Sequence, residues 1–219
     1  MRSLYSLFEK HQQFWTREQV MGFIKILSLF IVSLTIQHFA DHYVGHVTGV
    51  PVGDLILNQI PAVDIDLFVV QGALLFTLIM IGLLIWKPRY ILFTGGALSV
   101  FIIVRSFFIS LTHLGIDPHE IVLDTHSIGF GLYNLLYNSK SDFFFSGHTG
   151  APFLLGLIFL RDKWLSFFCF TVSAIFGTSV LLGHIHYSID VFAAPFMTYS
   201  IFILAKKLFP NEYSLISPK

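Results

Sequence analysis

Six apolar stretches, each about twenty residues long, run through this chain of 219 residues. Each is long enough to cross the hydrocarbon core of a bilayer as a helix. The mean hydropathy of +0.75 and the charged fraction of 12% exclude an ordinary soluble domain. We therefore expect an all-α integral membrane protein that forms one domain over residues 1–219. The predicted spans lie near residues 20–40, 66–86, 90–112, 143–160, 164–183 and 188–208.

The charged residues are segregated between the two sides of this predicted bundle. The lysines and arginines beside the spans fall on one side: Arg2, Lys10, Arg17, Lys25, Lys87, Arg89, Arg161, Lys163, Lys206, Lys207 and Lys219. The positive-inside rule makes that side cytoplasmic and places both termini there. The opposite side carries one cation, Lys140, and many acids: Asp41, Asp54, Asp64, Asp66, Asp117, Glu120, Asp124 and Asp142.

Two short segments place ionisable side chains at the edges of apolar stretches. They are Ser146-Gly147-His148-Thr149 and His186-Tyr187-Ser188-Ile189-Asp190. Ionisable groups at membrane depth are costly and mark functional sites. If a helix begins near His186, Asp190 lies one turn along the same face and can orient the imidazole as a nucleophile. His148 could then protonate a leaving group, which indicates phosphoryl transfer on a lipid at the non-cytoplasmic (periplasmic, extracellular or lumenal) side.

The order of these motifs resembles a known family. Two segments are similar to the paired motifs of the lipid phosphate phosphatase (PAP2) superfamily. The first is Asp142-Phe143-Phe144-Phe145-Ser146-Gly147-His148-Thr149. The second is Leu181-Leu182-Gly183-His184-Ile185-His186-Tyr187-Ser188-Ile189-Asp190-Val191. The likeness is to its sphingomyelin-synthase-like branch. Two weaker matches extend it: Arg105 followed by Thr112, and the loop Pro51-Val52-Gly53-Asp54-Leu55.

The resemblance implies a six-helix PAP2-like bundle and a role for each motif residue. His186 would attack phosphorus and form a phosphohistidine, Asp190 would orient it, and His148 would protonate the departing lipid alkoxide. The branch transfers phosphocholine from phosphatidylcholine to ceramide, releases diacylglycerol and needs no metal or other cofactor. The expected partners are thus a phospholipid donor and a lipid-alcohol acceptor, with no nucleic acid. The candidate phosphate-binding or substrate-binding residues are Arg105, Ser146, Gly147, Thr149 and Tyr187.

The sequence departs from the family pattern at positions that bind the phosphate and at a position next to the first motif that bears on the choice of head group. Many phosphatases of the superfamily carry an arginine where this chain has Val180, and they carry a Lys-x6-Arg-Pro motif that is missing here. Arg105 is the candidate replacement, because a guanidinium can hold two phosphate oxygens. The Cys-Gly-Asp of the branch is Lys140-Ser141-Asp142 here, so another head group, such as ethanolamine phosphate, stays open.

Other interpretations remain open at this stage. A phosphatase or a phospholipase C-type hydrolase would send the same intermediate to water. A transporter or lipid-binding protein would use the histidines without turnover. His148 could merely cap a helix, and Arg105 could snorkel to the interface. The segment from Leu114 to Lys140 could gate the site or be passive.

Other histidines lie outside the two motifs. His184 is expected to point away from His186. His38, His42 and His46 recur every fourth residue. They form a metal-binding stripe only if a helix continues past Gly45 and Gly49, and we expect interfacial histidines instead.

Overall fold

The computed structural model describes residues 2–47, 49–137 and 144–217, and over these ranges it is helical without strands. Its long helices are α2 (Arg17–His46), α3 (Ala73–Trp86), α4 (Ile91–Leu111), α7 (Lys163–Leu182) and α8 (Ser188–Leu208). Shorter helices are α1 (Arg2–Phe14), α5 (Phe130–Tyr137), α6 (Gly147–Ile158) and α9 (Pro210–Ser214). Single turns are η1 (Leu57–Gln59), the π-helical η2 (Leu67–Gly72) and η3 (Pro88–Tyr90).

Five of the six predicted spans are confirmed as helices long and apolar enough to cross a membrane. They run over Arg17–His46, Leu67–Trp86, Pro88–Leu111, Lys163–Leu182 and Ser188–Leu208. Most bounds lie within a few residues of the prediction, because the apolar length of a span is a local property of the sequence. The first helix is longer than expected and continues to His46.

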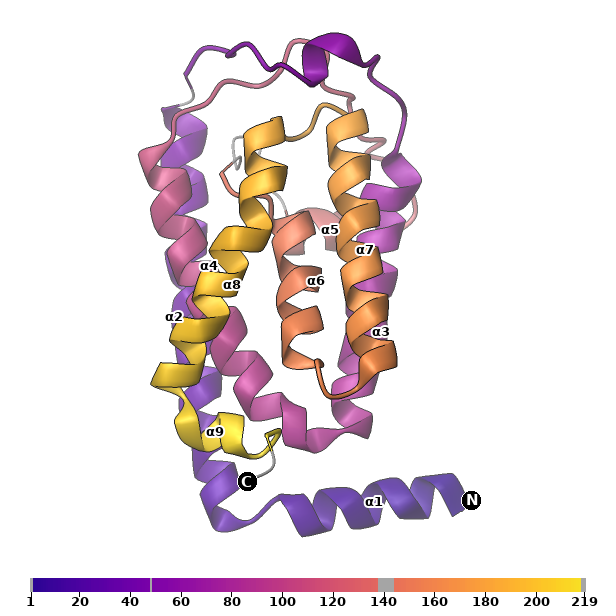
Figure 1. The fold of residues 1–219 in the computed structure, drawn as a ribbon, viewed down its shortest axis with the longest axis vertical. Helices are drawn as coiled ribbons and strands as arrows, with labels where there is room; N and C mark the ends of the chain where they lie inside the picture. Colours follow the sequence, from indigo (N-terminus) through magenta and orange to yellow (C-terminus); the bar gives the residue numbers. More distant parts are fainter. Residues whose placement is uncertain (1, 48, 138–143, 218–219) are drawn as a thin grey trace.

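The predicted span at 143–160 differs from the others. Its helix, α6, has 12 residues, so it is about 18 Å long and shorter than the hydrocarbon core of about 30 Å. The helix begins only at Gly147, after the Ser146 N-cap. Figure 1 shows α6 between α7 and α8, with its first turn inside the bundle and not at its end. A helix that starts at this depth carries its N-terminal residues into the protein interior.

Close packing and polar contacts hold α6 in this central position. A Cβ atom on Gly150 would lie 2.8 Å from the ring of Phe101 and 2.9 Å from Thr198 Oγ1, so only glycine permits this approach. Ser173 Oγ on α7 donates to the Thr149 carbonyl at 2.7 Å, and Ser166 Oγ donates to the Gly156 carbonyl at 2.8 Å. Small residues and hydroxyl groups of this kind stabilise helix contacts inside membranes. The first turn of α6 is therefore held firmly.

The outer surface of the bundle fits a lipid environment. Large apolar side chains such as Ile31, Phe107 and Phe196 are exposed on α2, α4 and α8. Exposed apolar area of this extent is rare on soluble monomers and typical of membrane-facing helices. The buried core lies inside, where α6 packs on α7 and α8, and α4 packs on α2 and α8.

The two ends of the bundle differ as the charge pattern predicts. Figure 1 shows both termini at one end, together with the α6–α7 turn, and the long loops at the other. Lys87 and Asp162 form an ion pair at the end with the termini. Lys140, Ser141, Asp142 and Phe143 lie outside the described residues. Which end faces the cytoplasm stays a prediction.

Single cysteines at the two ends test this orientation. We expect Val122→Cys, at a position that is 94% exposed in a long loop, to react with a membrane-impermeant maleimide in intact bacteria that express the chain. Lys163→Cys, at the opposite end, should react only after permeabilisation. The wild-type chain is the control, because its single cysteine, Cys169, is buried. The reverse labelling pattern would contradict the predicted orientation.

Candidate active site

The first motif forms the N-terminus of α6. Ser146 is the N-cap, and its side-chain oxygen accepts a hydrogen bond from the Thr149 backbone N–H at 3.4 Å. Serine is favoured at this position because its oxygen satisfies an otherwise unpaired N–H of the first turn. The Ser146 N–H itself donates to the Asp190 carbonyl at 3.0 Å. The two motifs, which are far apart in the sequence, are thus joined through their backbones.

The second motif forms the connection from α7 to α8. The helix α8 begins at Ser188, as the predicted span of 188–208 places it, and Tyr187 is its N-cap, so His186 lies just before the helix. The contact between His186 and Asp190 nevertheless forms, with 3.5 Å between Nδ1 and the carboxylate Oδ2. The same Oδ2 accepts the Tyr187 N–H at 3.0 Å. One oxygen of Asp190 therefore caps the helix and lies beside the imidazole of His186.

The two histidines meet at one place. The ring centroids of His148 and His186 are 6.2 Å apart, with an angle of 66° between the ring planes. The side chains of His186 and Asp190 are 4% and 0% exposed. Since Nδ1 of His186 faces Asp190, its Nε2 is the nitrogen directed away from that carboxylate. This arrangement suits a nucleophile beside a proton donor.

Arg105 comes to the same place from α4. Its Nε donates to the Phe145 carbonyl at 2.8 Å, and its guanidinium carbon lies 3.3 Å from the position of a Cβ on Gly147. The side chain is buried and faces an internal cavity, which argues against the snorkelling interpretation. A buried guanidinium beside a helix N-terminus is suited to binding phosphate oxygens.

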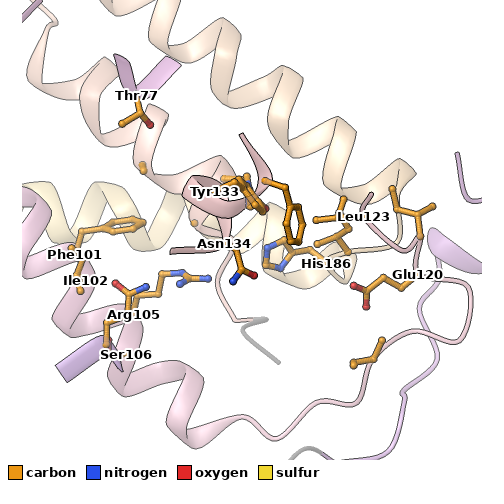
Figure 2. Close-up of a pocket in the computed structure, with 18 of the residues that line it drawn as sticks. Thr77, Phe101, Ile102, Arg105, Ser106, Glu120, Leu123, Tyr133, Asn134 and His186 are labelled. Atoms are coloured by element: carbon orange, nitrogen blue, oxygen red, sulfur yellow. The ribbon is translucent and has the colours of Figure 1, made fainter. Parts of the chain in front are cut away.

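These residues line one cavity of about 810 Å³. His148, His186, Arg105 and Gly147 form its polar part, and α2 and α4 contribute an apolar wall that includes Phe30, Leu34, Leu98, Phe101 and Ile102. Figure 2 shows His186 between Arg105 on one side and Glu120 on the other. A polar centre beside an apolar wall can accommodate a charged head group together with part of an acyl chain.

The described part of the predicted loop segment, residues 114–137, borders the cavity. Residues from Ile116 to Thr125 line it, and α5 contributes Tyr133 and Asn134. The Tyr133 hydroxyl oxygen lies 3.1 Å from His148 Nε2. Sequence reasoning missed this tyrosine, because nothing in the local sequence marks it and only the path of the loop brings it to the histidine.

Glu120 is a second residue that the sequence motifs did not reveal. Its carboxylate lines the cavity, and its Oε2 is buried without a hydrogen-bond partner among the described residues. Burial, followed by the negative charge of Asp117, raises the pKa of Glu120 to about 7. A carboxylate with a buried oxygen in this cavity is a candidate contact for a positively charged group.

Three of the predicted binding residues lie beside the cavity without lining it. Ser146 and Thr149 bond to each other behind His148, with 3.3 Å between their hydroxyl oxygens. The hydroxyl of Tyr187 donates to the Gly115 carbonyl at 2.8 Å and accepts the Val52 N–H at 3.3 Å. The side chain of Tyr187 thus ties two loops together, and a role of Tyr187 in substrate binding stays a prediction.

The loop Pro51-Val52-Gly53-Asp54-Leu55 contacts the start of α8 through the carboxylate of Asp54, which accepts hydrogen bonds from backbone N–H groups. Asp54 Oδ2 accepts the Ser188 N–H at 2.7 Å, and its Oδ1 accepts the N–H groups of Ile56 and Leu57. Burial by itself would raise the pKa of Asp54, but these backbone hydrogen bonds together lower it. The loop therefore supports the start of α8 next to His186.

The three histidines of the α2 stripe lie on a helix that continues further past Gly45 than the sequence suggested. The helix continues to His46 without a break at Gly45, and the rings of His42 and His46 lie 4.5 Å apart. His38, His42 and His46 are all exposed. Within the described part of the chain, the group of side chains that could hold a metal ion is Asp117, His119 and His184, and it does not include this stripe.

Comparison with known proteins agrees with the motif analysis. Residues 141–207 match the family model described as PAP2 superfamily C-terminal, which spans α6, α7 and α8 and both histidine motifs. Searches of curated proteins and of solved structures give no significant match. The family match covers less than half of the chain, and it supports membership of the PAP2 superfamily and an activity on lipid phosphates.

Proposed function

We propose that this protein is a membrane-embedded lipid phosphotransferase that moves a phospho-head group from a glycerophospholipid to a lipid alcohol such as ceramide. The observation that carries the proposal is the convergence of His148, His186 and Arg105 on one cavity with an apolar wall, with Asp190 buried beside His186. The family match supports the broader class of phosphatase or phosphotransferase. Transfer to a lipid alcohol, and not to water, is the more specific step that we propose.

The first step forms a bond between His186 and phosphorus. In this step Nε2 of His186 attacks, the bond from phosphorus to the glyceride oxygen breaks, and His148 gives its proton to the departing alkoxide. Asp190 stabilises the positive charge that develops on the His186 ring. Arg105 and the first-turn amides of α6 offset the negative charge on the phosphoryl oxygens.

The second step reverses the roles. The acceptor hydroxyl attacks phosphorus while His148 takes its proton, and the bond from phosphorus to His186 breaks. A lipid hydroxyl gives transfer, whereas water gives the hydrolase that is the main alternative. The apolar wall built by α2 and α4 favours a lipid acceptor, because it offers an acyl chain a place beside the histidines.

Replacement of the two histidines tests the chemistry. In liposomes with labelled phosphatidylcholine and ceramide, His186→Ala should lower the rate by more than about 10³-fold, and His148→Ala by about 10²- to 10⁴-fold. His126→Ala, at an exposed position of the covering loop, is the control and should keep full activity.

The products separate the alternatives. Labelled sphingolipid supports transfer, and water-soluble phosphocholine or phosphate would show a hydrolase. With a donor labelled on phosphorus, an alkali-stable label should be trapped on the wild-type chain and not on His186→Ala. Absence of turnover with every phospholipid would overturn the proposal in favour of transport or lipid binding.

The activity should depend on the several N–H donors of the Arg105 guanidinium as well as on its positive charge. Arg105→Lys keeps one positive charge but cannot donate to both Phe145 and a phosphate in the same way. We expect kcat/KM to fall by roughly 30-fold, which corresponds to about 2 kcal/mol for a lost charged hydrogen bond. Arg89→Lys, at the opposite end of the bundle, is the matched control. Equal rates for Arg105→Lys and wild type would exclude a bidentate role.

Glu120 should select for a positively charged head group. We expect Glu120→Gln to reduce the preference for phosphatidylcholine over phosphatidylglycerol by about 10-fold, because a neutral amide no longer attracts the choline cation. Asp124→Asn removes a negative charge from an exposed position of the same loop and is the control. The measurement is the ratio of initial rates with the two donors. An unchanged ratio in Glu120→Gln would remove Glu120 from head-group recognition.

A further inference from the structure

A second cluster of polar side chains lies at the edge of the cavity, which its member Asp117 lines, and takes no part in the proposed transfer. Asp117 and His119 belong to the covering loop, and His184 belongs to the α7–α8 connection, two residues before His186. Asp117 Oδ1 lies 3.2 Å from His184 Nδ1 and 3.4 Å from His119 Nδ1. His184 and Asp117 are buried, whereas His119 is exposed at the surface of the loop.

The hydrogen bonds of His184 indicate a cation at this cluster. Its Nε2 lies 3.2 Å from the Ile60 carbonyl, which can only accept, so Nε2 carries a hydrogen. A neutral ring then has its lone pair on Nδ1, directed at the Asp117 carboxylate. That oxygen already accepts the His119 backbone N–H at 2.8 Å. Two groups that only accept are therefore opposed, which is unfavourable unless a proton or a metal ion lies between them.

The three ligand atoms lie within 4.8 Å of one another, which is close enough for one metal ion to contact all of them. Neighbouring ligands of a tetrahedral zinc ion with bonds of about 2.0–2.1 Å lie about 3.3 Å apart, and the observed separations are 3.2 and 3.4 Å. Two imidazoles and one carboxylate form a donor set that zinc accepts, with one position left for water. A ligating histidine commonly donates its other N–H to a carbonyl, as His184 does to Ile60.

We propose that Asp117, His119 and His184 bind a divalent transition-metal ion of the zinc type. The ion takes no part in the transfer chemistry. It connects the covering loop to the segment that carries His186 and acts together with the hydrogen bond from the Ile121 N–H to the Gly183 carbonyl. Because residues from Ile116 to Thr125 line the cavity, the ion stabilises the closed position of the loop over the site.

Direct metal titration tests the site without any measurement of turnover. The full chain, purified with an affinity tag that contains no histidine and stripped with a chelator, is titrated with Co²⁺ and then with Zn²⁺. We expect the visible absorption of tetrahedral Co²⁺, its displacement by Zn²⁺, and about one zinc per chain by elemental analysis. His119→Ala changes an exposed side chain and should fold normally, yet its zinc affinity should fall by about 10- to 100-fold or more.

Two control variants separate this cluster from the other histidines. His126→Ala, in the same loop, and His46→Ala, in the α2 stripe, should both keep one zinc per chain. Loss of zinc in His46→Ala, or no stoichiometric binding to the wild type, would overturn the site and leave His184 and Asp117 as an ion pair.

Hydrogen exchange tests the effect of the ion on the loop. Zinc should slow exchange in residues 114–125 by at least about 10-fold in the wild type and have no such effect in His119→Ala. Stoichiometric binding without this protection would overturn the proposed effect on the loop. Because neither measurement uses a phospholipid, failure of the metal site is distinguishable from failure of the proposed transferase function.

Discussion

The buried carboxylate of Asp190 is the constraint on which the site depends. A carboxylate that is withdrawn from water is stable only when hydrogen bonds and charges compensate its desolvation. Asp190 receives the Tyr187 N–H and faces His186, while its backbone carbonyl accepts the Ser146 N–H. One residue thus caps α8, contacts the ring of His186 and joins this segment to the one that carries His148. The geometry of both histidines follows from these three contacts.

Hydrogen bonds between the loops at one end of the bundle stabilise the segment that carries His186 and Asp190. Tyr187 bonds to Gly115 and Val52, and Asp54 caps the start of α8 through Ser188. These loops are polar and irregular, yet they have definite partners because unpaired backbone groups near the membrane are costly. The family match covers the helices with the histidines, whereas these supporting contacts come from the first half of the chain.

The likeness to the synthase branch was more informative about the positions of the two histidine motifs than about the role of Tyr187. The segments around His148 and His186 lie where the motifs placed them, and Arg105 lies against Gly147 as a replacement for the missing phosphate-binding cations would require. Tyr187 was assigned to substrate, but its hydroxyl is used between loops. Short motifs describe the residues that a reaction needs, and they say less about which neighbours bind substrate and which support the backbone.

The local pattern was sufficient for the long helices and for the His186–Asp190 pair, because apolar length and a four-residue spacing act within one segment. The end of α2, which continues to His46, packs on α4 through a buried cluster of Ala40, Val44 and Ile109, and local preference at Gly45 did not reveal this. Contacts across the chain were beyond sequence reasoning. Arg105 reaches Phe145 over 40 residues, Tyr133 reaches His148 over 15, and His184 reaches Asp117 over 67. Such contacts are set by the path of loops between packed helices, so only the tertiary structure could assign their partners.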